Sequence, residues 1–136
     1  MCGITGILNF KNKPIDISDI QKMNNRISHR GHDHSKIYIG SVNPDFSKYP
    51  GIALGHRRLS IIDLSESGNQ PMFNNSKTLC IVYNGEIYNA KFLRSEFTKS
   101  GYKFKSKCDT EVIIAGYELY GEKILDFLNG MYSFCI

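Results

Sequence analysis

The sequence predicts an α+β domain in which short strands are interspersed with amphipathic helices. Three observations indicate this fold class. The chain has 136 residues, of which 41% are hydrophobic and 22% are charged, a composition typical of one globular domain with a real core. Short apolar runs bounded by Gly, Pro or Asn are typical of strands. Segments with apolar residues three or four positions apart, next to helix start and stop residues, are typical of helices.

The first half of the chain predicts strands around one helix. Residues 4–10 are apolar and precede a turn-like Lys-Asn-Lys-Pro, so they predict a buried strand. Ser18 and Gln21 have the spacing of a capping box, which predicts a helix start. The apolar residues expected on one face of that helix are Ile20, Met23 and Ile27. Two further strands are predicted over residues 36–42 and 52–62.

The second half begins with a hairpin pattern. Residues 78–83 and 86–88 resemble strands on either side of Asn84-Gly85, a dipeptide typical of a tight type I′ turn. An amphipathic helix is predicted over residues 90–100, ended by the glycine that follows.

The remaining elements are shorter. Residues 102–107 carry Lys at every second position, which is typical of an edge strand that avoids pairing with other chains. Asp109 stands at the N-cap position of a helix predicted over residues 112–120. A short helix up to residue 128 and an apolar strand over residues 131–136 follow. Because that strand stops without a turn or a polar tail, we expect a domain truncated at its C-terminus.

Composition excludes several function classes. The net charge is +4, but the basic residues are scattered, so we expect no nucleic-acid partner. The apolar runs are too short to cross a bilayer, and no signal peptide is recognisable, so we expect no membrane partner and a cytoplasmic location. Four cysteines without a Cys-x-x-Cys pair argue against disulfides and zinc ribbons: Cys2, Cys80, Cys108 and Cys135.

Cys2 is the first candidate for chemistry. Removal of Met1 would leave it as the N-terminal residue, with a thiol and a free α-amine on the same residue. An α-amine with a pKa of about 7.7–8.0 serves as a general base near neutral pH, and a thiolate is a strong nucleophile. Taken alone, however, a cysteine at the second position is more often a small hydrophobic residue.

Five sequence blocks give Cys2 its context. They are MCGITG at residues 1–6, GHRRLSIIDL at 55–64, QPM at 70–72, YNGEIYN at 83–89 and DTEVI at 109–113. A chain with these blocks in this order resembles the glutaminase half of the asparagine synthetases, which are class II glutamine amidotransferases with an N-terminal nucleophile. The resemblance runs over residues 1–136. It implies a four-layer αββα sandwich of the N-terminal nucleophile (Ntn) hydrolase type, an incomplete glutaminase domain, and a synthetase domain absent from this chain.

The resemblance implies a reaction and its catalytic groups. Glutamine would be hydrolysed to glutamate and ammonia through a thioester on Cys2, whose α-amine relays protons. The side chain of Asn84 and the backbone N–H of Gly85 would form the oxyanion hole. From the residues alone, Asn84-Gly85 is also explained as a simple turn, and the two interpretations are compatible because a tight turn exposes a backbone N–H.

The same resemblance assigns the substrate contacts. Arg58 would bind the α-carboxylate of glutamine through a bidentate guanidinium, whereas Arg57 has no assigned role and is expected to be a surface charge. Asp109 would bind the α-ammonium, although the residues alone favour its interpretation as an ordinary helix N-cap. Glu86 is expected to line the pocket, and the carbonyl of Ile62 to assist in binding the ammonium.

Further partners follow from the family alone. The ammonia would pass to an ATP-dependent synthetase domain, where ATP and magnesium are expected, while this domain would need no cofactor and no metal. The complete protein is expected to form a homodimer. The chain departs from the usual family pattern at three positions, with His32 in place of Pro, Cys108 in place of Ser and Asn69 in place of His.

Two other function classes remain open. His29, His32 and His34 stand close to Asp33, so a metal-dependent hydrolase with zinc bound by these histidines is an alternative. The chain is also explained as a non-catalytic amidotransferase fragment that acts as a binding module.

Overall fold

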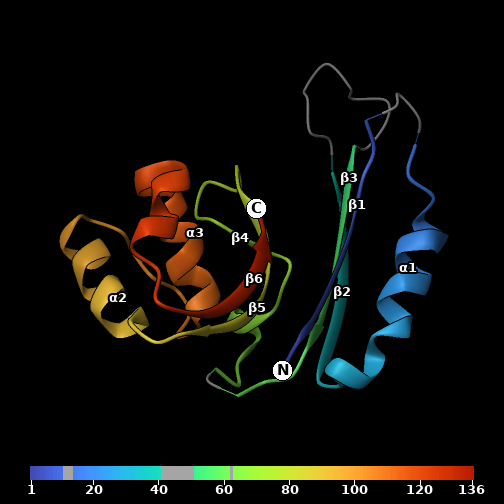
Figure 1. The fold of residues 1–136 in the computed structure, drawn as a ribbon, viewed down its shortest axis with the longest axis horizontal. Helices are drawn as coiled ribbons and strands as arrows, with labels where there is room; N and C mark the ends of the chain where they lie inside the picture. Colours follow the sequence, from blue (N-terminus) through green and yellow to red (C-terminus); the bar gives the residue numbers. More distant parts are fainter. Residues whose placement is uncertain (11–13, 41–50, 62) are drawn as a thin grey trace. The chain divides into compact units, whose positions relative to one another are not determined.

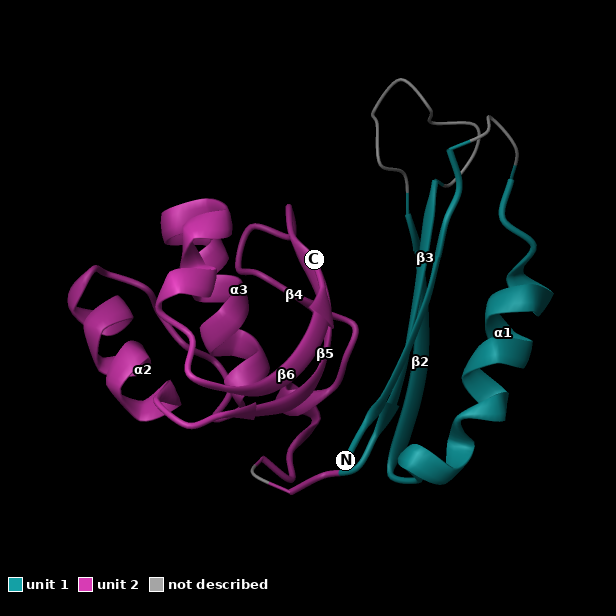
Figure 2. Ribbon diagram, in the orientation of Figure 1, with its two compact units in different colours: residues 1–59 teal, residues 60–136 magenta. Residues whose placement is uncertain are grey.

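The computed structural model describes residues 1–10, 14–40, 51–61 and 63–136. The chain divides into two compact units, Met1–Leu59 and Ser60–Ile136 (Figures 1 and 2). Each unit has a three-stranded antiparallel sheet of its own, with helical segments packed on it. An α+β class is therefore confirmed within each unit. Every helix in the described part of the chain falls short of the length and apolarity that crossing a bilayer requires.

The sheet of unit 1 has the strand order β1-β3-β2. Its strands are β1 (Gly3–Leu8), β2 (His34–Gly40) and β3 (Ile52–Arg58). Both β1 and β2 pair antiparallel with the central β3, in which Ala53, Leu54 and His56 are fully or almost fully buried. The three predicted strands are confirmed, but two are shorter than predicted: β1 ends at Leu8 instead of residue 10, and β3 ends at Arg58 instead of residue 62. The strand predicted over residues 36–42 is confirmed up to Gly40, the last of its residues that the structure describes.

One α-helix covers this sheet. It is α1 (Ile17–Arg26), followed by the 3-10 turn η1 (Ser28–Arg30), and Figure 1 shows it lying along one face of the strands. Ile20 is fully buried, but Met23, predicted on the same face, is 39% exposed. The predicted capping box is wrong: the N-cap is Asp16, whose carboxylate accepts from the backbone N–H of Ser18 at 2.8 Å.

The sheet of unit 2 corrects the predicted hairpin. Its strands are β4 (Met72–Phe73), β5 (Cys80–Ile87) and β6 (Gly130–Cys135), in that order. Asn84 and Gly85 lie inside β5 and pair with Ser133 and Tyr132 of β6, so they form no turn. A Cβ atom at Gly85 would lie 2.6 Å from the Cα of Tyr132 and would collide with the Met131 carbonyl oxygen. The close approach of β6 therefore explains why position 85 is a glycine.

The helices of unit 2 pack on one face of its sheet. They are α2 (Ala90–Lys99), α3 (Asp109–Tyr120) and the 3-10 helix η4 (Gly121–Asp126), with a short 3-10 turn η3 (Glu66–Gly68) near the start of the unit. Leu93 and Phe97 of α2 are buried with Ile81 and Ile87 of β5 and with the apolar side of α3. The helices predicted over residues 90–100 and 112–120 and the short helix after them are confirmed.

The segment over residues 102–107 is not the predicted edge strand. Its aromatic and lysine side chains do alternate between the core and solvent, but its backbone is not paired in a sheet. Instead, the N–H groups of Lys105 and Ser106 donate to the carboxylate of Glu111, at 2.8 and 2.6 Å. Arg94 donates to the carbonyl oxygen of Ser106 at 2.9 Å. Side chains of α2 and α3 therefore replace the ladder of a sheet and fix the approach to α3.

Candidate functional site

In unit 1, Cys2 and Arg58 lie at the same end of the sheet. Gly3 pairs with Arg57 in antiparallel register, so the same register carried one residue further sets Cys2 opposite Arg58. The backbone N–H of Leu59 lies 3.4 Å from the Cys2 Sγ and donates to it. The half-buried thiol of Cys2 thus has a hydrogen-bond donor within reach.

The loop after α1 holds this end of the sheet. Arg30 Nε donates to the carbonyl oxygen of Cys2 at 3.1 Å, and the N–H of Asp33 donates to the carbonyl oxygen of Arg58 at 3.0 Å. Gly31 lies so close to β3 that a Cβ atom there would be 2.6 Å from the Arg58 carbonyl oxygen. A glycine is therefore needed where the loop touches the strand.

The two adjacent arginines of β3 face opposite ways, as strand geometry requires. Arg57 Nε donates to the carbonyl oxygen of Asn24 in the last turn of α1, at 2.9 Å. The prediction that Arg57 is a surface charge is wrong, because it links the sheet to the carbonyl end of the helix. Arg58 belongs to the face away from α1, which the register also assigns to Cys2, and it is only 7% exposed.

In unit 2, one edge of β5 carries a row of backbone N–H groups. The N–H of Tyr83 donates to Gln70 Oε1 at 2.6 Å, and the N–H of Ile87 donates to Asp109 Oδ2 at 2.9 Å. N–H groups of alternate residues in a strand point to the same edge, and β6 occupies the other edge. The N–H of Gly85 therefore points to the same side as these two and lies between them.

Asn84 and Glu86 project from β5 on the opposite face from Tyr83 and Ile87, which belong to the helix-covered core. Asn84 Oδ1 is buried and accepts no hydrogen bond from any residue that the structure describes. A buried amide oxygen without a partner is uncommon in a folded protein. Glu86 is exposed.

Asp109 is the first residue of α3, and the N-cap position belongs to Cys108. The N-cap interpretation is therefore wrong, and the carboxylate accepts from β5 instead of from its own helix. Burial raises the pKa of the Asp109 carboxyl above its ordinary value. The bond from Ile87 opposes this rise in pKa, the charge of Glu86 adds to it, and Arg94 opposes it. A cation bound at this carboxylate would stabilise its charged form.

Asp63 connects two segments of unit 2. Its Oδ2 accepts from the N–H of Lys107 at 2.8 Å, and its Oδ1 accepts from the N–H of Ser65 at 2.9 Å. Asp63 thereby links the segment after β3 to the approach of α3. Ile62, the residue before it, lies outside the described residues, so the prediction for its carbonyl remains a prediction.

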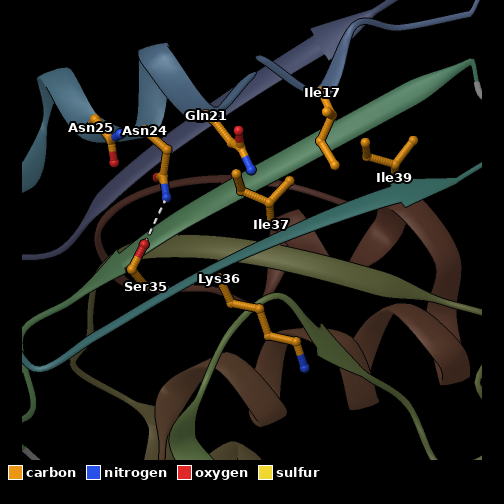
Figure 3. A pocket seen from close by; sticks show the side chains of 8 residues that line it. All are labelled: Ile17, Gln21, Asn24, Asn25, Ser35, Lys36, Ile37 and Ile39. Carbon is orange, nitrogen blue, oxygen red and sulfur yellow. Dashed lines mark hydrogen bonds between the residues drawn. The ribbon is translucent and has the colours of Figure 1, made fainter. Parts of the chain in front are cut away.

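A groove in unit 1 lies away from these candidates. It has a volume of about 650 Å³ and lies between α1 and β2. Figure 3 shows the amide of Asn24 donating to the hydroxyl of Ser35 across it, at 3.0 Å. The lining residues are Ile17, Gln21, Asn24, Asn25, Ser35, Lys36, Ile37 and Ile39. None of the predicted site residues that the structure describes lines this groove.

The histidine cluster is placed unfavourably for a metal. His29 and His32 are exposed on the loop after α1, and His34 begins β2 opposite Arg58. Among the described residues, which include this whole cluster, no three His, Cys, Asp or Glu side chains come close enough to hold a metal ion. The arrangement does not favour the metal-dependent hydrolase.

Two residues that support the candidates were missed from the sequence: Arg30, which bonds to Cys2, and Gln70, which bonds to the neighbours of Asn84 and Asp109. Arg30 bonds to a residue 28 positions away, and no local pattern indicates such a contact. Gln70 belongs to the QPM block, but the block alone gives no reason for a buried amide. A polar residue next to a proline before a strand was the signal available, and it is weak.

Comparisons with known proteins extend over the whole chain. A family model described as a glutamine amidotransferase domain matches residues 1–136. A putative glutamine-hydrolysing asparagine synthetase of Methanocaldococcus jannaschii is 41% identical, over 100% of this chain and 27% of its own. Asparagine synthetase B of Escherichia coli, also named glutamine-hydrolysing, is 36% identical, over 100% of this chain and 23% of its own. The chain thus spans about a quarter of the length of these relatives.

Among solved structures, the chain is similar to the glutamine phosphoribosylpyrophosphate amidotransferase of Bacillus subtilis. The TM-score is 0.74 with 22% identity, and the match covers 96% of this chain and 34% of the other. This likeness confirms the predicted fold class, that of glutamine amidotransferases of the Ntn-hydrolase type.

Proposed function

Because the chain belongs to the glutamine amidotransferase domain family, we propose that it hydrolyses glutamine to glutamate and ammonia, with the Cys2 thiol as nucleophile. The observation that carries this proposal is the edge of β5, where the Gly85 N–H and the Asp109 carboxylate lie on the same side of one strand. Glutamine needs an oxyanion donor for its side-chain carbonyl and an anion for its α-ammonium.

The reaction begins at Cys2 after removal of Met1. The α-amine takes the proton of the thiol, and the sulfur attacks the carbonyl carbon of the glutamine side chain. The C–N bond breaks, and ammonia leaves after receiving the proton from the α-ammonium. Water then attacks the thioester, which releases glutamate and restores the thiol. A retained Met1 would convert the α-amine into an amide, which is not a base, so the chain with Met1 attached is expected to be inactive.

The remaining candidates have roles suited to their chemistry. The side-chain amide N–H of Asn84 and the backbone N–H of Gly85 donate to the oxyanion of the tetrahedral intermediate. Arg58, a buried guanidinium at the same end of its sheet as Cys2, binds the α-carboxylate. Asp109 binds the α-ammonium. Glu86 lines the same pocket, and the Ile62 carbonyl assists.

The product and partner follow from the relatives. They are named glutamine-hydrolysing asparagine synthetases and are about four times as long as this chain, which supports delivery of the ammonia to a synthetase domain. ATP and magnesium would bind to that domain and not to this one. Formation of a homodimer by the complete protein is part of the same proposal. The proposal also includes a cytoplasmic location, which is consistent with the four free cysteines.

A kinetic comparison tests the function. The complete protein should release glutamate from glutamine, and Cys2→Ala should abolish this release, whereas Cys135→Ala, at an exposed cysteine, should not. Intact mass should show that Met1 is absent from the active protein. Activity that survives Cys2→Ala but is lost to a chelator would instead support the metal-dependent alternative. A folded protein with neither activity would support the non-catalytic one.

A further inference from the structure

A buried amide joins the two elements that carry the proposed glutamine contacts in unit 2. Gln70 is 4% exposed, and its Oε1 accepts from the N–H of Tyr83 in β5 at 2.6 Å. Its Nε2 donates to the hydroxyl of Thr110 in α3 at 3.0 Å, and Thr110 is 2% exposed. The amide therefore has a partner at each end, one on the strand and one on the helix, as a buried polar group requires.

The position of Gln70 explains why its side chain, and not a backbone carbonyl, accepts the N–H of Tyr83. Met72 pairs with Ile81, and the same antiparallel register carried two residues further sets Gln70 opposite Tyr83. Pro71, which lies between Gln70 and Met72 in the chain, has no N–H to donate, and β4 begins only at Met72. The side-chain oxygen of Gln70 thus accepts the N–H of Tyr83 where the backbone ladder has stopped.

Two links join β5 to α3 beside the proposed site, and the bonds of Gln70 are the first of them. Tyr83 directly precedes Asn84, and Thr110 directly follows Asp109. The second link is the bond from the N–H of Ile87 to Asp109 Oδ2. The two links bind β5 to the first turn of α3 on either side of the Gly85 N–H. Together they fix the separation between the oxyanion donors on the strand and the carboxylate on the helix.

We propose that Gln70 is a positioning residue that sets this separation to the length of glutamine. The inference rests on the proposed function, in which the α-ammonium binds at Asp109 and the side-chain carbonyl at Asn84 and Gly85. The α-carbon and two methylene groups separate these two ends of glutamine, so the distance between their partners must be held within narrow limits. A displacement of about 1 Å at a reacting group costs about a hundredfold in rate.

The test uses matched variants of the complete protein. Thr110→Val removes the hydroxyl with little change in shape, and Thr110→Ser keeps it. Gln70→Met removes both bonds at similar length, and Gln21→Met is the control at an exposed glutamine of α1. For each variant, kcat and KM are measured with glutamine and with 4-carbamoylbutanoate, which is glutamine without its α-ammonium. Thermal unfolding of each variant reports the fold.

A positioning role predicts a loss that depends on the substrate. For Thr110→Val and Gln70→Met, kcat/KM for glutamine should fall about tenfold to a hundredfold. The loss with 4-carbamoylbutanoate should be much smaller, because that molecule makes no contact with Asp109. Thr110→Ser should restore activity with glutamine.

Two results would overturn this inference and leave the proposed function standing. They are equal losses on both substrates, which indicate a purely structural role, and unchanged kinetics in both variants. If Gln70→Met does not fold, Thr110→Val and Thr110→Ser decide the question. If the unaltered protein fails to hydrolyse glutamine, the proposed function falls and this inference falls with it.

Discussion

Replacement of Asp109 by asparagine separates a ligand-binding carboxylate from a structural one. The amide oxygen of asparagine can still accept the N–H of Ile87, which now donates to Asp109 Oδ2 at 2.9 Å, so the link between β5 and α3 is kept. What is lost is the negative charge. A hydrogen bond to a charged group contributes about 1.5–3 kcal/mol, so the KM for glutamine should rise about tenfold to a hundredfold.

The same change should not weaken the fold. Burial raises the pKa of the Asp109 carboxyl, so its ionised form is less favourable in the folded protein than in the unfolded chain. Its contribution to stability is complete below the ordinary pKa and is lost as the pH rises through the raised value. At pH 7 Asp109→Asn should therefore unfold at the same or a higher urea concentration. As the pH falls through the raised pKa, the unaltered protein should gain stability relative to the variant.

Two assays check these expectations. Glutamate release at varied glutamine concentration gives KM, and urea unfolding between about pH 4 and pH 8 gives the free energy of unfolding. Asp126→Asn, at an exposed carboxylate at the end of η4, is the matched control for both. A variant that loses 2 kcal/mol or more of stability at pH 7, an amount of about the size expected for a broken buried bond, with KM unchanged would refute the reasoning. Asp109 would then be a structural residue.

Three further substitutions test the remaining candidates. Arg58→Ala should raise the KM for glutamine about tenfold or more, and Arg58→Lys should recover part of the loss, because lysine keeps the charge but not the bidentate geometry; unchanged kinetics in steady-state assays would contradict the carboxylate assignment. Asn84→Ala should lower kcat about 10²- to 10³-fold if the side chain is an oxyanion donor, whereas a loss seen only in thermal unfolding would leave it a structural residue. Gly85→Ala should destabilise unit 2 by about 1–3 kcal/mol in urea unfolding, because its Cβ would strike the Met131 carbonyl oxygen; a fully stable variant would show that β6 can move away.

Periodic patterns predicted the helices because the same side chains make the core. Leu93 and Phe97 are one turn apart in the sequence of α2 and are 3% and 2% exposed in the structure. The prediction of an edge strand over residues 102–107 was wrong, because the pattern of side chains did not indicate the partners of the backbone. Its alternation is real, but Glu111 and Arg94 supply the backbone partners that a neighbouring strand would have supplied. A sequence pattern predicts which way side chains face and does not predict which group satisfies the backbone.

The candidate residues were assigned from short blocks of sequence, and their supports were not. Arg30 and Cys2 are 28 positions apart, and Gln70 and Thr110 are 40 positions apart. Contacts at such separations depend on how strands pair and on where the backbone hydrogen bonds between them stop. A local window of sequence does not contain this information. Positioning groups such as Gln70 are therefore found only after the register of β4 and β5 is known.

The Asn84-Gly85 pair joins the fold to the proposed chemistry. In a type I′ turn, the central residues would protrude at the end of a hairpin, where a loop is free to move. Inside β5, Gly85 instead allows β6 to approach closely, while its own N–H points to the opposite edge of the strand. The N–H groups two residues before and after it are bound to Gln70 and Asp109. An oxyanion donor must be held rigidly, because it stabilises charge without rearranging during the reaction. The strand, with a link on either side, provides that rigidity. Gly85 is therefore better suited to the proposed oxyanion role inside β5 than it would be in a turn.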